Sequence, residues 1–287
     1  MKHIQWFPGH MTKAMRMMQE NVALVDGGIV VLDARAPAAT LNRKLVKLFG
    51  AKPVLFVLNK ADLADDRRTD GFLNEITKNG FFAAKCSATF SSAGKQLSAK
   101  IREMLSDKIE KDAQKGISRP LRLMVAGIPN AGKSTVINAL SGAKRAVTGD
   151  KAGVTRGKQW IRLSGFELLD TPGTMPPSFE NQTLARHLGC IGSINDDILD
   201  FYDLACGLLE ELKEEYPELL KIRYGLEDFS SSAAMLEGVC RRRGLIIRGG
   251  EADTERGTRA LIDDFRKGRI GRITLENPVN YVGYFKK

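Results

Sequence analysis

One short segment combines residue types and spacing suited to binding phosphate. Residues 127–134 read Gly-Ile-Pro-Asn-Ala-Gly-Lys-Ser and fit the pattern G-x-x-x-x-G-K-[ST]. Glycines let backbone N–H groups close around a phosphate, and a helix that starts here adds a favourable dipole. Lys133 would neutralise the β- and γ-phosphates, and Ser134 would ligate Mg²⁺. We expect the nucleotide contacts to come from Asn130, Ala131, Gly132, Lys133, Ser134 and Thr135.

A second motif suits the γ-phosphate and its metal ion. In Asp170-Thr-Pro-Gly173 the aspartate could hold Mg²⁺, usually through water, and the Gly173 N–H could touch the phosphate with no side chain in the way. D-T-P-G also makes a good turn, so its position downstream of the phosphate loop is what gives it weight. Between the two motifs, Thr155 could supply a second hydroxyl to Mg²⁺, although a solvated loop threonine would look the same.

A third motif, Asn59-Lys-Ala-Asp62, predicts which base is bound. The Asp62 carboxylate can accept from both N1–H and the exocyclic amine of guanine, whereas adenine would leave it unpaired at a cost. Lys60 would lie along the base plane, and Asn59 would hold the phosphate loop. Farther along, the backbone N–H groups of Ser87 and Ala88 could meet guanine O6. N-K-x-D by itself is common at helix caps. It predicts guanine here because the same chain also carries the phosphate-binding motif.

These motifs follow short apolar runs of the kind that form buried parallel strands. The clearest runs are residues 28–33, 53–59 and 121–127, with 166–170 weaker and 81–87 plausible. Amphipathic patterns predict helices between and after these runs, over 12–25, 41–49, 66–79, 94–113 and 134–140. The alternation predicts an α/β fold with a mostly parallel sheet and helices on both faces.

The pattern changes after about residue 180. Residues 196–215 carry apolar side chains at helical spacing, Pro217 should stop that helix, and 230–243 and 251–267 predict two more helices. No convincing strand alternates with them. We therefore expect an α/β domain over residues 1–180 and a mainly helical domain over 181–287.

The composition suits a cytoplasmic protein with a polyanionic partner. The chain has 287 residues and a net charge of +10, with a pI near 9.5. It shows no stretch long enough for a membrane span and no apolar N-terminal run of a signal peptide. The four cysteines are far apart, which predicts buried thiols rather than a zinc site. Two late basic clusters could track a phosphate backbone or form a solvated surface; they contain Arg241, Arg242, Arg243, Arg248, Arg256, Arg259, Arg266, Lys267, Arg269 and Arg272.

Together the motifs resemble those of translation-factor-class GTPases in a rotated order. N-K-x-D and S-A come before the phosphate loop, Thr155 and D-T-P-G, which gives the order G4-G5-G1-G2-G3 of a circularly permuted P-loop GTPase. The segments Gln5-Trp-Phe-Pro-Gly-His10 and Asp33-Ala-Arg-Ala-Pro37, with the helical C-terminal region, are most similar to the ribosome biogenesis GTPase A (YlqF) family. The resemblance implies a GTP hydrolase that uses Mg²⁺.

The resemblance also implies how hydrolysis would work. Many small GTPases orient water with a glutamine directly after D-x-x-G, but this chain has Thr174, where GTPases lacking that glutamine usually have an apolar residue. His10 matches the family's histidine and would replace the glutamine, with a structural or RNA-contacting role as the alternative. Asn130 matches an asparagine that helps bind K⁺ in related GTPases, or is an ordinary polar loop residue. The expected catalytic set is His10, Lys133, Thr155 and Gly173.

The implied partner is an assembling large (50S) ribosomal subunit and its rRNA, recognised by shape and backbone. We expect a monomer with no DNA partner. The leading hypothesis is a GTPase, stimulated by ribosomal RNA, that uses hydrolysis for a late maturation step and for its own release. Since the permutation leads residues 174–185 from the γ-phosphate site into the helical domain, loss of that phosphate should move the domain. The alternatives are a non-catalytic, GTP-gated RNA-binding regulator and a P-loop ATPase.

Overall fold

The centre of the molecule is a six-stranded sheet in the order β3-β2-β1-β4-β6-β5. We describe a computed structural model, which places residues 4, 9–142, 159–176 and 179–286. Four neighbouring pairs are parallel, and only β5 runs antiparallel, against β6. The strands are Gly27–Asp33 (β1), Val54–Asn59 (β2), Phe82–Lys85 (β3), Leu121–Gly127 (β4), Gln159–Leu163 (β5) and Phe166–Asp170 (β6).

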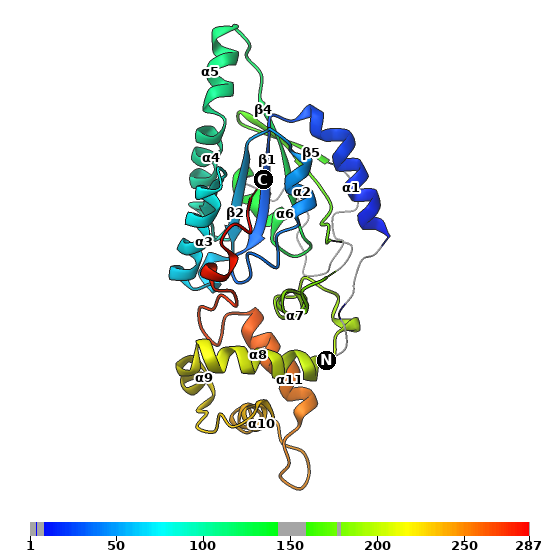
Figure 1. The fold of residues 1–287 in the computed structure, drawn as a ribbon, viewed down its shortest axis with the longest axis vertical. Coiled ribbons are helices and arrows are strands. Elements are labelled where there is room, and N and C mark those ends of the chain that lie inside the picture. The colour runs from blue at the N-terminus through cyan, green and yellow to red at the C-terminus, as the bar shows by residue number, and fades with distance from the viewer. Residues whose placement is uncertain (1–3, 5–8, 143–158, 177–178, 287) are drawn as a thin grey trace.

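Helices cover both faces of this sheet (Figure 1). Alternate residues of β1 point to opposite faces, so Val31 joins one buried cluster and Val30 the other. The first cluster includes side chains of α4 (Ala93–Met104) and α6 (Lys133–Ser141). The second includes side chains of α1 (His10–Asn21), α2 (Arg43–Leu48) and α3 (Asp66–Lys78). Burial on both sides explains the continuous apolar sequence of the inner strands.

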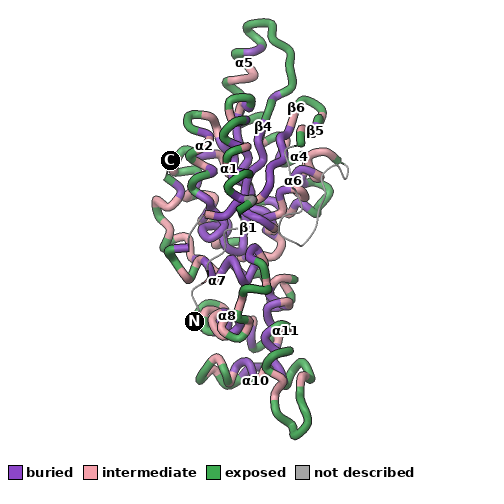
Figure 2. The backbone as a smooth tube through the Cα atoms, turned by 90° about the vertical axis from the view of Figure 1, so that its right-hand side faces the viewer, coloured by how far each residue is buried: buried purple, intermediate pink, exposed green. Residues whose placement is uncertain are grey.

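A group of helices follows the sheet in sequence and lies beyond one end of its strands (Figure 1). They are α7 (Gln182–Cys190), α8 (Phe201–Glu215), α9 (Pro217–Tyr224), α10 (Ser232–Arg242) and α11 (Thr254–Arg266). Leu208, Leu236 and Leu261 from three of these helices are fully buried in one core. That core is continuous with one face of the sheet, as the buried residues in Figure 2 illustrate.

The end of the chain returns to the α/β part, which the sequence pattern did not indicate. Residues 272–276, here called the C-terminal strap, run beside the loops that follow β1 and β2. Beyond a 3₁₀ turn at Pro278–Tyr281, Phe285 is buried edge-on against Phe56 and Phe72. The tail is therefore packed with the sheet, whereas the boundary expected at 180/181 assigns it to the helical domain.

Several predicted elements differ in detail from those in the structure. Residues 94–113 form two helices, α4 and α5 (Ser106–Gln114), because the backbone leaves helical geometry at the buried Leu105. Pro217 ends α8 but also opens α9, where its missing N–H is no loss in the first turn. Helices α7 and α9 and strand β5 are not indicated by the sequence pattern. Among the described residues, no helix is both long and apolar enough to cross a membrane.

Candidate nucleotide site

The polar motifs meet at one edge of the sheet because they follow parallel strands. Asp33 and Asn59 are partners at the ends of β1 and β2, and Val31 is opposite Gly127 at the end of β4. Asp170 is opposite Val125 at the end of β6. Ligands of open α/β sheets bind outside such carboxyl ends. The topology thus brings together motifs from both halves of the sequence.

The glycines of the phosphate loop are required by close backbone packing. Gly132 has φ of 91°, and a Cβ there would lie 2.1 Å from Nδ2 of Asn59. A Cβ on Gly127 would lie 2.5 Å from the Val31 carbonyl oxygen, and one on Gly173 would lie 2.6 Å from the Pro129 nitrogen. At Gly127 and Gly173 the neighbour is backbone, so no side chain fits there, and at Gly132 a side chain would displace the Asn59 amide. The D-T-P-G segment therefore lies directly against the phosphate loop, as a shared phosphate site needs.

Lys133 is the cation at the first turn of α6. It is 8% exposed, and its Nζ donates a 2.9 Å hydrogen bond to the Ile128 carbonyl within the same loop. Burial lowers the pKa of Lys133 to about 8, while the nearby Asp170 carboxylate acts in the opposite direction. A lysine held in a low-dielectric loop interacts strongly with phosphate, so this residue fits its expected role. Ser134 and Thr135 follow in the same turn.

The base-side motif is joined to the phosphate loop by its first two residues. Asn59 Nδ2 donates to the Ala131 carbonyl at 3.1 Å, which is the contact expected for this residue. Its Oδ1 accepts from the Ala88 N–H at 3.2 Å. Lys60, at φ of 60°, donates from Nζ to the Asn130 carbonyl at 2.8 Å. One asparagine thus ties both predicted base-side segments to the loop.

Asp62 lies in a 3₁₀ turn, Ala61–Leu63, next to the Cys86-Ser87-Ala88 segment. Its backbone N–H donates to the Ser87 Oγ at 3.0 Å, and the Ala61 N–H donates to the Cys86 carbonyl at 3.1 Å. The Ser87 hydroxyl therefore holds the turn that carries the Asp62 carboxylate, which the sequence predicts to select guanine. From the sequence, only backbone contacts are expected of Ser87.

The segment after D-T-P-G contacts both the phosphate loop and the N-terminal helix. The Thr174 N–H donates to the Gly127 carbonyl at 3.1 Å, and the Met175 N–H lies 3.3 Å from Sδ of Met11. His10 begins α1 beside Met11, so its backbone starts near this segment, but its side chain is outside the described part of the structure. Thr155 also lies outside the described residues.

Two buried charges, Asp33 and Arg35, lie near the site. The sequence indicates them only through the family resemblance of the segment 33–37, not as functional residues. In the structure Arg35 binds both Asp33 oxygens, at 2.9 and 2.7 Å, and Lys60 Nζ lies 2.9 Å from the same carboxylate. Burial alone would raise the pKa of Asp33, but the two cations outweigh burial and hold that pKa well below its ordinary value. The sequence shows the D-x-R spacing of Asp33 and Arg35, but it does not show that Lys60 lies beside the same carboxylate.

The C-terminal strap supports the same loops from the other end of the chain. Arg272 donates to the carbonyls of Ala61 and Ala64 at 3.0 and 2.9 Å. Thr274 Oγ1 donates to the Ala34 carbonyl at 3.0 Å, and Glu276 accepts from the N–H groups of Ala38 and Ala39. The loops that carry the base-side motif therefore depend on residues more than 200 positions away.

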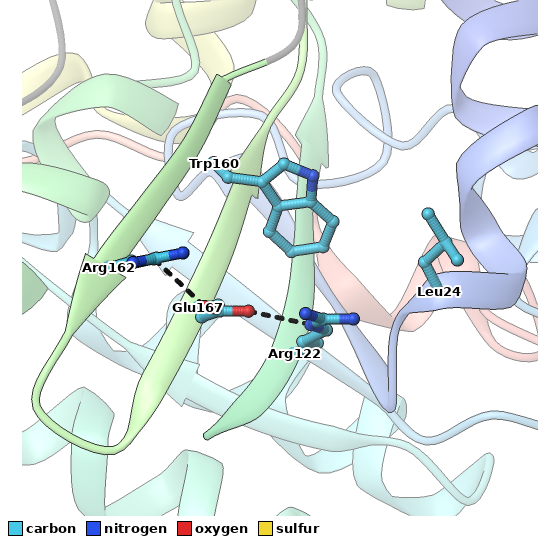
Figure 3. A pocket seen from close by; sticks show the side chains of 5 residues that line it. All are labelled: Leu24, Arg122, Trp160, Arg162 and Glu167. Carbon is cyan, nitrogen blue, oxygen red and sulfur yellow. Dashed lines mark hydrogen bonds and ion pairs between the residues drawn. The ribbon is translucent and has the colours of Figure 1, made fainter. Parts of the chain in front are cut away.

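A separate small cavity, of about 200 Å³, lies over β4, β6 and β5 (Figure 3). Glu167 accepts from Arg122 at 2.8 Å and pairs with Arg162 at 3.4 Å, and Arg122 stacks over Trp160. Leu24 completes the lining. None of these residues belongs to the nucleotide motifs, so this cavity is not part of the candidate site.

Comparison with known proteins agrees with the geometry. A family model described as 50S ribosome-binding GTPase matches residues 122–227. A Bacillus cereus protein named ribosome biogenesis GTPase A is 38% identical over 97% of this chain and 95% of its own length. This chain belongs to the ribosome biogenesis GTPase A family. A Thermotoga maritima member is 31% identical over 96% of this chain and 95% of its own length.

Solved structures of the family show the same fold. The GNP-bound YlqF structure from Thermotoga maritima has a TM-score of 0.63 and 27% identity, covering 93% of this chain and 98% of that one. The expected circularly permuted P-loop GTPase fold is therefore confirmed. The chain is a GTP hydrolase of ribosome biogenesis, which sets aside the non-catalytic and ATPase alternatives.

The described residues fit a guanine nucleotide with Mg²⁺. Glycines at 127 and 132 leave the backbone of the phosphate loop uncovered by side chains there, the buried Lys133 supplies positive charge, and Ser134 and Asp170 are oxygen donors of the kind that Mg²⁺ prefers. Bound there, the metal would neutralise charge on the phosphates. The chain's own part is to hold the loop, the base-side turn and the D-T-P-G segment in one arrangement.

Proposed function

We propose that this GTPase binds the assembling large (50S) ribosomal subunit and uses GTP hydrolysis to drive a late maturation step and its own release. The observation that carries the proposal is the path of the chain after D-T-P-G. Residues 174–176 leave the phosphate loop, and α7, the first helix of the helical part, begins at Gln182. The γ-phosphate end of the site is therefore close in sequence to the region that would contact the particle.

The RNA-binding surface is proposed on the exposed part of the helical region. Arg242 and Arg248 are exposed and form no ion pair within the described residues. Arg241 and Lys267 are also exposed, although each pairs on its own helix. By contrast, Arg266 and Arg272 donate to backbone carbonyls inside the molecule. The structure thus favours the first four residues for contact with an rRNA backbone, whose binding is electrostatic and salt-dependent.

The RNA surface can be tested by charge reversal. We expect Arg242→Glu with Arg248→Glu to weaken binding to large-subunit precursor particles at least about tenfold and to flatten its dependence on salt, since phosphate contacts are lost. Sedimentation of the protein with particles at several salt concentrations measures both. Lys78→Glu, on the exposed end of α3 in the α/β part, is the matched control. Equal binding by both variants would contradict the proposed surface.

The coupling of hydrolysis to the particle has its own experiment. Turnover of GTP is measured while large-subunit precursor particles are added, with mature subunits and naked rRNA as separate arms. We expect stimulation by the precursor and dissociation of the protein once GDP has formed. A rate that stays at its basal value at saturating particle would count against a particle-driven cycle.

For catalysis we propose that His10 orients the attacking water in place of the missing glutamine. This is supported by the start of α1 at His10, since the adjacent Met11 contacts Met175, the second residue after D-T-P-G. His10→Ala should slow hydrolysis at least about 100-fold, within the range of general acid–base effects, and leave GTP affinity unchanged. Single-turnover rates and nucleotide titration separate the two effects, and an unchanged rate would remove the assignment.

We further propose that Asn130 helps to hold K⁺ beside the phosphates. The Asn130 Nδ2 donates to the Gly192 carbonyl at 2.7 Å, so the amide is already oriented by a neighbour. Turnover in KCl is expected to exceed turnover in NaCl at equal ionic strength, and Asn130→Ala should abolish the difference. Equal rates in the two salts would show that K⁺ has no role.

A further inference from the structure

A closed circuit of contacts joins the nucleotide loops to the helical part. It starts at the phosphate loop, where the Asn130 amide donates to the Gly192 carbonyl at 2.7 Å. Gly192 follows α7 in a tight turn, with φ of 76°. This contact joins the phosphate loop to a turn of the helical region, in addition to the contacts within its own domain.

Arg266, at the end of α11, holds that turn in place. Its guanidinium donates to the carbonyls of Gly189 and Cys190 at 2.7 and 3.1 Å. It also pairs with Asp196 at 2.7 and 2.8 Å. A Cβ added to Gly192 would lie 3.3 Å from the guanidinium carbon, so the arginine lies directly on the turn. Arg266 therefore determines where the acceptor of Asn130 lies.

The circuit returns to the nucleotide loops through Arg35. Its Nη1 donates to the Arg266 backbone carbonyl at 3.0 Å, and its other nitrogens bind Asp33. Asp33 pairs with Lys60 at 2.9 Å, and Lys60 donates to the Asn130 carbonyl at 2.8 Å. Both Asp33 and Arg35 are almost fully buried. Low-dielectric surroundings make such charge-assisted contacts strong and costly to break singly.

Backbone geometry marks the same two positions independently. Within the described ranges, the non-glycine residues with positive φ are Lys60, at 60°, and Asn130, at 59°. Such conformations are unfavourable for residues with a side chain and persist only where surrounding contacts hold them. Here the two strained residues are hydrogen-bonded to each other and stand at the junction where the circuit meets the nucleotide site.

We propose that Arg35 and Arg266 are positioning residues for nucleotide binding, and that the circuit couples guanine-nucleotide occupancy to the placement of α7 and α11. The contacts at the site are made by Lys60 and Asn130, and the two arginines act through them. Because such coupling is reciprocal, a partner that displaces α11 would weaken nucleotide binding, and a bound nucleotide would hold α11 in place. This inference rests on GTP binding itself and not on the identity of the particle.

The first test removes the side chain that pins the turn. Arg266→Met keeps a good helix former and should raise the Kd for GDP at least about fivefold, the lower end of typical coupling. Lys221→Met is the control, since Lys221 pairs only with Glu218 on the same helix among the described residues. Titration with a fluorescent GDP analogue, without particles, gives both constants. A folded Arg266→Met protein with an unchanged Kd overturns the proposal.

Two further variants keep the test decisive. If Arg266→Met does not fold, Asp196→Asn weakens the same side chain from an exposed position and must also raise the Kd; no change there overturns the proposal. Arg35→Lys retains a charge for Asp33 but cannot span Asp33 and the Arg266 carbonyl. If the residues act as one circuit, the double variant that combines Arg35→Lys and Arg266→Met should have a Kd for GDP no higher than that of the more weakly binding single variant. If the two losses of binding free energy add up in the double variant, the circuit is refuted.

Discussion

At the residue scale, the nucleotide site depends on places where no side chain can be present. The Gly132 position shows this most clearly, because both its backbone angle and its neighbour Asn59 exclude a Cβ. The glycine and the asparagine come from motifs 73 positions apart, 59 and 132, that the fold brings into contact. One motif thus sets a steric requirement on the other.

Gly132→Ala should therefore abolish nucleotide binding without unfolding the protein. We expect GDP affinity to fall at least about 100-fold, because Asn59 must move away from a Cβ that would lie 2.1 Å from its amide. Gly142→Ala is the matched control, since Gly142 caps the other end of α6 with φ of 64° and no described residue lies within 4 Å of its added Cβ. Thermal unfolding and GDP titration of both variants measure the effect. Equal affinities would contradict the steric account.

At the element scale, the strands that carry the site were the easiest part to predict. β1, β2 and β4 are apolar throughout because both faces of the sheet are covered, and their ends agree with the predicted runs to within one residue. β5 was missed because it is a short edge strand whose exposed residues break the apolar pattern. The Ser164-Gly165 turn after it was the available signal.

The contacts between elements could not be predicted in the same way. Asp33 and Arg35 are two residues apart, but Arg35 donates to a carbonyl 231 positions away. Likewise, the basic residues Arg266 and Arg272 were read as a possible RNA surface, whereas both bind internal carbonyls. The local sequence shows a residue's charge and the helical spacing of its segment. Only the tertiary fold shows which group that charged side chain contacts.

Helix α7 is fastened to its neighbours by a buried histidine. His187 contacts Glu211 of α8 at 2.9 Å and Glu276 of the C-terminal strap at 3.2 Å. Burial by itself lowers the pKa of His187, but its hydrogen bonds to the two glutamates outweigh burial and raise that pKa to about 9. The imidazolium form is therefore favoured in the folded protein, and Arg186 adds a second cation beside Glu211.

The sign of this shift predicts a loss of stability at alkaline pH. Because the folded pKa of about 9 exceeds the ordinary 6.5, the stabilisation is complete below pH 6.5 and is lost as the pH rises through 9. The shift corresponds to roughly 3 kcal/mol. We expect the free energy of unfolding to fall between these pH values in the wild type and to fall less in His187→Gln.

Denaturant titrations of both proteins at several pH values make the measurement. The pKa of Lys133 is lowered in the fold, so this residue changes the stability in the opposite direction as the pH rises. Because Lys133 is present in both proteins, the difference between their free energies of unfolding isolates the effect of His187. Parallel curves for wild type and His187→Gln would show that His187 is not charged in the folded state.

At the scale of the whole molecule, the chain's last residues complete the α/β part. Phe285 is 1% exposed and packs against Phe56 of β2 and Phe72 of α3. Two residues of the same tail, Val279 and Val282, are at least 70% exposed, so burial is specific to the aromatic anchor. The helical region is thus held at both of its ends by the sheet domain.

Phe285→Ala should lower the free energy of unfolding by about 3–5 kcal/mol, the range for truncating a buried aromatic side chain. Val282→Ala, three positions earlier and 75% exposed, should change it by less than about 0.5 kcal/mol. Urea unfolding of the two variants gives the comparison. A loss below about 1 kcal/mol for Phe285→Ala would show that the tail is not anchored in solution.

The C-terminal strap also bears on when, during synthesis, the base-side loops can be held in place. The residues expected to face guanine lie between positions 59 and 88, whereas Arg272 to Glu276, which hold the loops after β1 and β2, are synthesised much later. Synthesis runs from the N-terminus at roughly 5–20 residues per second, so these supporting contacts are absent while the early strands form. We therefore expect a nascent chain to carry the guanine motif before the contacts that hold its loops exist.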